Sequence, residues 1–324
     1  MKKENKKVDV KKIVSDHSAL VSFLALFMVA LLAKGTMFLQ FNNIINILRN
    51  NSVVGIIALG MTLIIITGGI DLSVGSQLAF MGVVIINVLV TTQNVFLALL
   101  SGVVVALIVG FLTGYITAKF QVPAFITTLG TMSIYRSISQ FWMNGGGISS
   151  SGDASSSYIA ISNTKLFGLI PMPIVIWIIC AIVIYLFMTH TSTGKHIYAV
   201  GSNAKAAKLA GVNVVKVKTM VYMIGSVLIL IATIVETSRL GSVNSASSGS
   251  GYEMDAIAAA VIGGTSMAGG KGTIGGTVLG TLTLGIIDNL MNLLGVNPFL
   301  VKAVKGTIII VAVLLQIFLN KKND

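Results

Sequence analysis

Charged residues and cysteine are scarce in this chain, and each shortage narrows the classes of protein it can belong to. Asp, Glu, Lys and Arg make up only 10% of its 324 residues, whereas soluble domains carry about 25%. Hydrophobic residues make up 55%, and a soluble chain of this length would leave much apolar surface exposed to water. The single cysteine, Cys180, cannot form a disulfide within the chain. The composition therefore indicates a polytopic membrane protein.

Motifs for catalysis, metal binding and nucleotide binding are also missing. Residues 268–272 (AGGKG) resemble part of a phosphate-binding loop, but the pattern G-x-x-x-x-G-K-[ST] needs Gly where Thr265 stands and Ser or Thr where Gly272 stands. His190 and His196 are six residues apart, which is not a metal-ligand spacing. We therefore expect no catalytic residue, no metal and no cofactor bound by this chain, which argues against a membrane enzyme acting on lipid.

Acidic residues are sparse within the apolar segments, where Asp71, Glu236 and Asp288 stand alone. A carrier coupled to protons or sodium typically places several acids within its spans. The sequence therefore disfavours a stand-alone secondary carrier, which remains the alternative to a transporter driven by a separate subunit.

The net charge of +12 is concentrated in three segments. Six lysines lie in residues 1–12, five lie between Lys195 and Lys218, and two stand at 321–322. Basic residues beside apolar spans mark the cytoplasmic side of a membrane protein, so we expect all three segments there. No basic face is interleaved with aromatic residues, and we expect no nucleic acid partner.

The apolar segments predict about ten transmembrane helices, because a helix needs about 20 residues to cross the hydrocarbon layer. The eighth, 254–267, is short and is alternatively half of a re-entrant pair with the ninth. We predict an all-α fold with a transmembrane permease domain over residues 19–319. The expected spans are 19–39, 52–67, 72–90, 95–118, 124–143, 171–188, 219–237, 254–267, 273–294 and 299–319.

Ten spans place both termini in the cytoplasm, with a basic tail over 1–18 and a short tail over 320–324. They also place the Lys-rich loop 189–218 in the cytoplasm and two Ser-rich loops, 144–170 and 238–252, outside. The agreement of these independent charge patterns supports the count.

Two shorter patterns concern helix packing. Residues 41–49 (FNNIINILR) have apolar positions at helical spacing but are too few to span, so we expect a short helix lying flat at the outer surface. The fourth span contains Gly110-x-x-x-Gly114, a spacing that lets helices pack closely. Ordinary glycine usage in membrane helices explains that spacing equally well.

Two segments break an apolar run with paired glycines, at 60–76 (GMTLIIITGGIDLSVGS) and 262–280 (IGGTSMAGGKGTIGGTVLG). Lipid offers a broken backbone no hydrogen-bond partner, so such breaks mark paths through transporters. Their repetition indicates either an internal duplication or glycine-rich low complexity. The candidate residues of a translocation path or inner gate are Thr67, Gly68, Gly69, Asp71, Ser73, Gly269, Gly270 and Lys271.

Asp71 itself has two interpretations, a substrate ligand or a hydrogen-bonded cap of the helix that follows. Counting charges places the first break near the cytoplasmic end of its spans, where an acid at a helix N-terminus is stabilised. We therefore expect Asp71→Asn to affect assembly or gating more than substrate affinity.

Three segments together resemble the membrane permease subunits of bacterial ABC importers for simple sugars, the ribose-type family. They are 59–76, 198–218 (YAVGSNAKAAKLAGVNVVKVK) and 251–280 (GYEMDAIAAAVIGGTSMAGGKGTIGGTVLG), in order and over nearly the whole chain. Permeases for branched-chain amino acids and nucleosides share weaker forms of these motifs and remain alternatives. One departure is that 145–157 has no proline where family members often carry one.

The resemblance implies a multi-pass protein of the bacterial plasma membrane that translocates a monosaccharide, with a ribose-like sugar as first choice. It implies a second permease copy or paralogue, two cytoplasmic ATPase subunits that use ATP, and an external solute-binding protein. It assigns ATPase coupling to part of the Lys-rich loop, where Asn203 is placed to cap a short helix, 204–210, that Gly211 ends. The implied coupling residues are Gly201, Ser202, Asn203, Ala207, Ala210 and Gly211.

Overall fold

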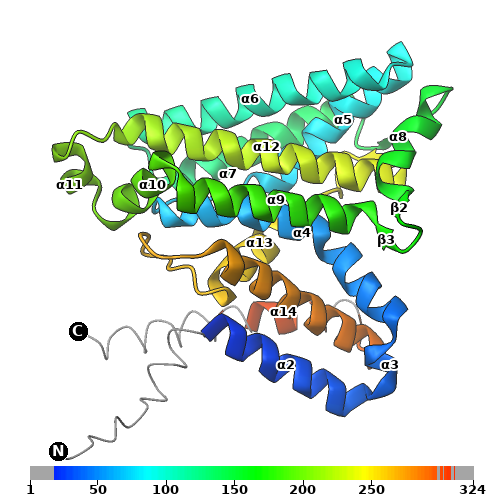
Figure 1. Ribbon diagram of the computed structural model, residues 1–324. Coiled ribbons are helices and arrows are strands. Elements are labelled where there is room, and N and C mark those ends of the chain that lie inside the picture. Colours follow the sequence, from blue (N-terminus) through cyan, green and yellow to red (C-terminus); the bar gives the residue numbers. More distant parts are fainter. Residues whose placement is uncertain (1–17, 298–299, 302, 308–309, 311–324) are drawn as a thin grey trace, which may run out of the picture.

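The computed structural model describes residues 18–297, 300–301, 303–307 and 310, and helices dominate it. Figure 1 shows the long helices lying side by side, with their connections gathered at two ends. The long helices are α4 (Phe41–Ile66), α5 (Val74–Thr92), α6 (Val95–Lys119), α7 (Ala124–Trp142), α9 (Met172–His190), α12 (Val214–Leu240) and α14 (Ile274–Leu293). The shorter helices are α2 (Ser18–Lys34), α3 (Thr36–Leu39), α8 (Ala154–Asn163), α10 (Ser192–Ser202), α11 (Ala204–Leu209) and α13 (Tyr252–Ile262).

Six of the described helices, α4, α5, α6, α9, α12 and α14, are long and apolar enough to cross a membrane. The all-α, multi-pass prediction is therefore confirmed, while the count of ten and the side on which the termini lie stay predictions. Most of the tenth expected span, and both predicted tails, fall outside the described residues.

The prediction of a separate flat helix at 41–49 is wrong. Those residues form the first turns of α4, a continuous helix of 26 residues, about 39 Å long. Within these turns Asn43 faces protein, since it donates to the Phe38 carbonyl at 2.8 Å and pairs with the Asn289 side chain, whereas Asn42, Asn46 and Arg49 are exposed.

The eighth expected span is a short helix followed by a broken segment. Helix α13 has only 11 residues, about half of what a membrane crossing requires. The chain then runs without helix over 263–273 before α14 begins. Such backbone is tolerated at membrane depth only within protein or beside water, and Gly263 and Thr265 of this segment are buried.

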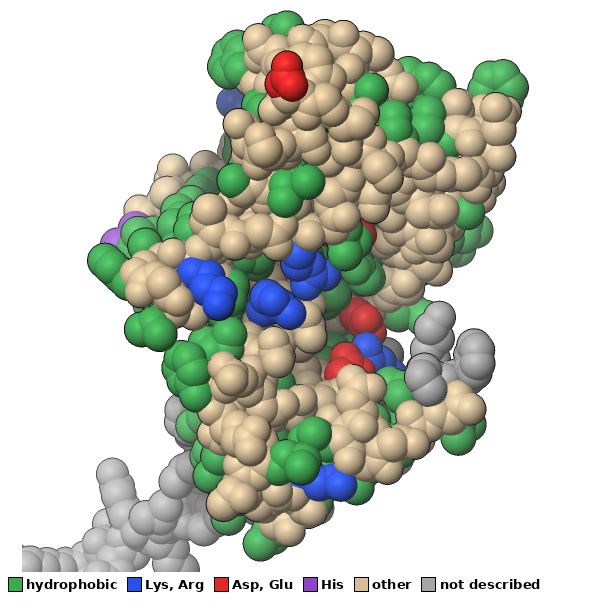
Figure 2. Space-filling view, turned by 90° about the vertical axis from the view of Figure 1, so that its right-hand side faces the viewer, with side chains coloured by type: hydrophobic (Ala, Val, Ile, Leu, Met, Phe, Trp, Pro, Cys, Tyr) green, Lys and Arg blue, Asp and Glu red, His purple; other side chains and the backbone are tan. Residues whose placement is uncertain are grey.

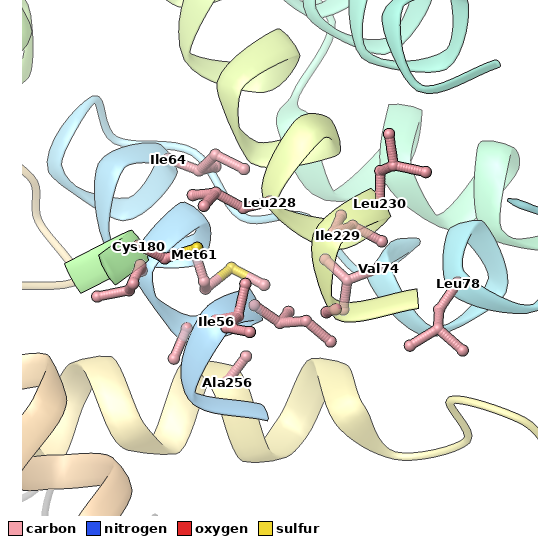
Figure 3. Close-up of a cluster of buried hydrophobic side chains, with 14 of the residues drawn as sticks. Ile56, Met61, Ile64, Val74, Leu78, Cys180, Leu228, Ile229, Leu230 and Ala256 are labelled. Carbon is pink, nitrogen blue, oxygen red and sulfur yellow. The ribbon is translucent and has the colours of Figure 1, made fainter. Parts of the chain in front are cut away.

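The core is built around α4, whose residues from Ser52 to Ile66 are enclosed by α9, α12, α13 and α14. Figure 3 shows Ile56, Met61 and Ile64 of α4 meeting side chains of its neighbours, among them Leu228 of α12 and Cys180 of α9. By contrast, α6 and α9 carry many exposed large apolar side chains, which suits helices that face lipid.

Glycines let the central helices approach closely. A Cβ atom on Gly110 or Gly114 would lie within 2.9 Å of the α12 backbone at Met223 or Thr219. The predicted close-packing role of the Gly110-x-x-x-Gly114 spacing is therefore confirmed.

The two ends of the bundle differ in composition, and each is named after its characteristic residue. The Lys-rich end comprises 67–73, 120–123, 191–213 and 263–273, and the Ser-rich end comprises 93–94, 143–171 and 241–251.

The two Ser-rich loops of the sequence meet at the Ser-rich end. Strand β1 (Gly147–Ser149) pairs antiparallel with β4 (Ser242–Asn244), while β2 (Lys165–Leu166) and β3 (Ile170–Pro171) form a small hairpin. Arg136 of α7 donates to the carbonyls of Ser245 and Ser248 at 2.9 and 3.0 Å, so this intramembrane charge is satisfied by protein.

Candidate functional site

The three sequence motifs meet at the Lys-rich end. The amide of Gly270 donates to the carbonyl of Ile66, the last residue of α4, at 2.9 Å. The hydroxyl of Tyr198 in α10 donates to the Gly272 carbonyl at 2.8 Å, and burial raises the pKa of this tyrosine. We call this meeting point the junction, and it consists of Ile66, Gly68, Tyr198, Gly201, Ser202, Gly269, Gly270 and Gly272.

Glycine is required at the junction because backbone meets backbone there. A Cβ atom on Gly201 would lie 1.8 Å from the Ile66 carbonyl oxygen and 2.7 Å from the Gly270 nitrogen. Gly269 and Gly270 have φ angles of +86° and +72°, which glycine adopts without steric cost. Residues predicted for two separate roles, coupling and inner gate, therefore lie against one another, with Lys271 exposed beside them.

Helices α10 and α11 are short but individually capped. The Thr191 hydroxyl accepts from the Gly194 amide at 3.0 Å, and the Asn203 side chain accepts from the Ala206 amide at 3.0 Å. Helix α11 ends at Leu209, and Gly211 follows with a φ of +85°. The predicted cap, helix and stop are confirmed to within one residue.

The outer surface of α11 differs from the one expected. Ala207 is only 6% exposed and packs inward, whereas Leu209 is 91% exposed. Ser202, Asn203, Ala210 and Gly211 are also exposed, as are the neighbouring lysines of the helix. Sequence reasoning missed Leu209, although its position two residues after a buried alanine is the signal that could have placed it outward.

A cavity of about 800 Å³ separates α11 from the ends of α4 and α6. Its lining brings together three of the predicted path residues with Gly211 of the coupling group. The lining residues are Thr67, Gly68, Gly69, Thr117, Ala118, Gln121, Val122, Pro123, Ala124, Ala204, Lys205, Lys208, Gly211, Val212, Asn213, Val214, Val215, Lys218 and Tyr222.

Asp71 and Ser73 do not line this cavity and are buried in a closed network. The Asp71 carboxylate accepts from the amide and hydroxyl of Ser73 at 2.8 and 2.6 Å and from the Gln77 amide group at 3.0 Å. Ser226 of α12 in turn donates to the Gln77 carbonyl oxygen at 3.0 Å. These partners lie at the start of α5, but none of them is a backbone amide of its first turn, so Asp71 holds Ser73 and Gln77 in place and does not cap the helix as expected.

The described residues contain no group of three or more His, Cys, Asp or Glu side chains arranged to hold a metal ion. What the Lys-rich end offers is an exposed capped helix, a backbone junction beneath it, and a cavity beside both. This arrangement suits attachment of another protein.

A protein-family model described as branched-chain amino acid transport system / permease component matches residues 43–313. No solved structure matches the chain.

Individual relatives cover nearly the whole chain. It is 40% identical over 294 residues to the ribose import permease protein RbsC of Escherichia coli K12, covering 88% of each. It is 36% identical over 320 residues to the protein of the same name in Bacillus subtilis, covering 98% of each. It is 35% identical over 270 residues to the L-arabinose transport system permease protein AraH of Escherichia coli, covering 83% of this chain and 81% of that one.

Proposed function

This chain belongs to the family of branched-chain amino acid transport system permease components, and we propose that it translocates a monosaccharide, with ribose as first choice. It is a multi-pass protein of the bacterial plasma membrane and a transport subunit, not an enzyme. The names of its relatives support a sugar, because ribose and arabinose permeases match it over most of their length.

The energy for transport comes, in this proposal, from ATP used by two separate cytoplasmic ATPase subunits docked at the Lys-rich end. The observation that carries this assignment is α11, a capped helix in which Leu209 is almost fully exposed after the exposed Lys205 and Lys208, with the junction behind the helix. An exposed leucine on a rigid short helix suits insertion into an apolar groove of a partner. The five lysines of 195–218 support a cytoplasmic location for this end.

The Ser-rich end then faces outward and receives substrate from a solute-binding protein. The paired β1–β4 ribbon ties the two Ser-rich loops into one surface. A second copy of the chain or a close paralogue completes the transporter in this proposal.

The test is ATP hydrolysis by the permease purified together with its ATPase. Addition of sugar-loaded binding protein should stimulate hydrolysis, and ribose should be the most effective sugar of a panel. Lack of stimulation by every sugar-loaded binding protein would exclude the proposal. Stimulation only by a binding protein loaded with a branched-chain amino acid or a nucleoside would assign that substrate instead. Sugar transport in liposomes without any ATPase would indicate a stand-alone carrier.

Leu209→Asp tests the docking surface. A charge in place of this apolar contact should release the ATPase during purification and abolish stimulation, while the permease stays folded because the side chain makes no internal contact of its own. The control is Leu169→Asp, a leucine that is 61% exposed at the Ser-rich end, which should retain the ATPase. Retention of the ATPase by both variants would remove α11 from the docking surface.

A further inference from the structure

A second cavity, of about 310 Å³, lies at the opposite end of the bundle. It is formed by the first turns of α4, the start of α13, the end of α14 and Val301. Eight of its twelve lining residues are Asn, Asp or Tyr, so its chemistry is unlike that of the apolar core. We call it the carboxamide pocket, and its lining residues are Asn46, Ile47, Asn50, Asn51, Val54, Tyr252, Asp255, Gly285, Asp288, Asn289, Asn292 and Val301.

The pocket opens toward the Ser-rich end. Figure 2 looks onto that end and shows acidic and basic side chains gathered in a hollow between two masses of the molecule. Asn46 and Asn292 are exposed, and within the described part of the chain their amides make no hydrogen bond to protein. Their donors and acceptors are therefore available to a solute.

An ion cluster fixes the charge of the pocket. The Lys305 ammonium lies 3.1 Å from the Asp255 carboxylate and 2.9 Å from that of Asp288, which ties α13 and α14 to the last described helical residues. Together with Arg239 on Asn50 and Glu236 on Tyr252, the charged groups around the pocket are three carboxylates and two cations, which leave one negative charge. An anionic solute is repelled by that charge, whereas a neutral one is not.

The remaining polar groups are held in place by protein. Asn51 donates to the Ile47 carbonyl at 2.8 Å, which leaves its side-chain oxygen as an acceptor. The Tyr252 hydroxyl donates to Glu236 at 2.7 Å, and Asn289 pairs with Asn43 at 2.7 Å. The Asn50 side-chain oxygen accepts from Arg239 at 3.5 Å, so six of the eight polar lining residues have protein partners, which lowers the entropic cost of binding.

We propose that the carboxamide pocket is a contact site for a neutral polyhydroxylated solute on its way into the permease, and this assignment rests on the proposed function. Hydroxyl groups both donate and accept, and carboxamides beside carboxylates offer both partners at short spacing. The isobutyl group of a branched-chain amino acid would remove these polar groups from water without pairing them, at a cost that disfavours it. The pocket volume lies at the small end of ligand sites, which suits a single sugar ring.

Chemical labelling can test this directly, because the only native cysteine, Cys180, is buried. Asn292→Cys places a thiol in the pocket, and Asn42→Cys places one on an exposed position of α4 outside it. A membrane-impermeant maleimide is added to right-side-out vesicles that hold the full transporter. D-ribose, ribose 5-phosphate and L-leucine are the probes.

Ribose should lower the labelling rate of Asn292→Cys in a saturable way. The rate should fall about tenfold when the sugar concentration is about ten times its dissociation constant. It should leave Asn42→Cys unchanged, and neither ribose 5-phosphate nor leucine should protect either thiol. Adding Asn46→Leu should raise the dissociation constant measured at Asn292→Cys about three- to tenfold, the value of one hydrogen bond.

The outcomes separate this inference from the function it rests on. If ribose-loaded binding protein stimulates ATP hydrolysis but ribose protects neither thiol, the pocket assignment is wrong and the sugar permease stands. Protection by leucine instead of ribose would overturn the solute class. If no sugar stimulates hydrolysis, the proposed function fails, whatever the labelling shows.

Discussion

The two ends of the bundle hold their segments together in different ways. At the Lys-rich end the contacts are between backbones, since Gly270 donates to the Ile66 carbonyl and Gly201 leaves no space for a side chain. Around the carboxamide pocket, near the opposite end, α13 and α14 are joined instead by side chains, with Lys305 bridging Asp255 and Asp288. A backbone junction depends on shape and tolerates few substitutions, whereas a side-chain cluster depends on charge and hydrogen bonding and selects by chemistry.

The largest effect is expected at the junction. Gly201→Ala would place a methyl group 1.8 Å from the Ile66 carbonyl oxygen, and two backbones cannot separate locally, so we expect a loss of about 3 kcal/mol or failure to assemble. Thermal unfolding of the purified permease measures it. The control is Gly275→Ala in α14, where a Cβ atom meets nothing within 4 Å and the change should be neutral or stabilising. Equal behaviour of the two variants would refute the backbone junction.

The next largest loss of stability is expected from substitution in the ion cluster. Lys305→Met leaves the carboxylates of Asp255 and Asp288 facing each other without a cation, and we expect a loss of about 2 kcal/mol because all three groups are partly exposed. Lys305→Arg keeps the charge and should retain most of the stability. An unfolding temperature for Lys305→Met equal to that of the arginine variant would show that charge does not hold this end together.

A smaller loss of stability is expected from substitution of Asp71 in the hydrogen-bond network at the start of α5. Asp71→Asn turns one acceptor toward the Gln77 amide group into a donor, and we expect a loss of about 1–2 kcal/mol. Because Asp71 is only 2% exposed and fully partnered, the sugar preference of ATP stimulation should not change. Altered sugar preference with normal assembly would reassign Asp71 as a substrate ligand.

The smallest global effect is expected at the cap of α11. Asn203→Ala removes the acceptor for the Ala206 amide and costs about 1 kcal/mol of local helix stability. The unfolding temperature should hardly move, while retention of the ATPase should fall. Asn203→Ser keeps a capping oxygen and should restore retention, so loss of the ATPase from both variants would point to direct contact by the asparagine.

Features that depend on neighbouring residues could be predicted from the sequence. Asn203 and Gly211 delimit α11 because capping and left-handed backbone are local properties. The break at Gly68–Gly69 and the packing at Gly110 and Gly114 follow from the same kind of pattern.

Features that depend on contacts between residues far apart in the chain could not be predicted from the sequence. Lys305 lies 50 residues from Asp255 in sequence, and nothing local marks the two as partners. Residues 41–49 were interpreted as a separate surface helix because they are too few to span, and helical spacing alone does not say whether the helix continues into the apolar run that follows. The eighth span predicted from the sequence was too long, because a buried segment without helix is as apolar in sequence as a helix is.

Helix α4 connects the two ends in a direct mechanical sense. Its first turns carry Asn46 and Asn50 of the carboxamide pocket, and its last residue accepts the hydrogen bond of the junction. A helix resists compression along its axis because each turn is braced by hydrogen bonds. With no proline in its 26 residues, α4 is a continuous helix from the carboxamide pocket to the junction. Under the proposed function, an axial shift of α4 at the carboxamide pocket would therefore also move the junction at the Lys-rich end.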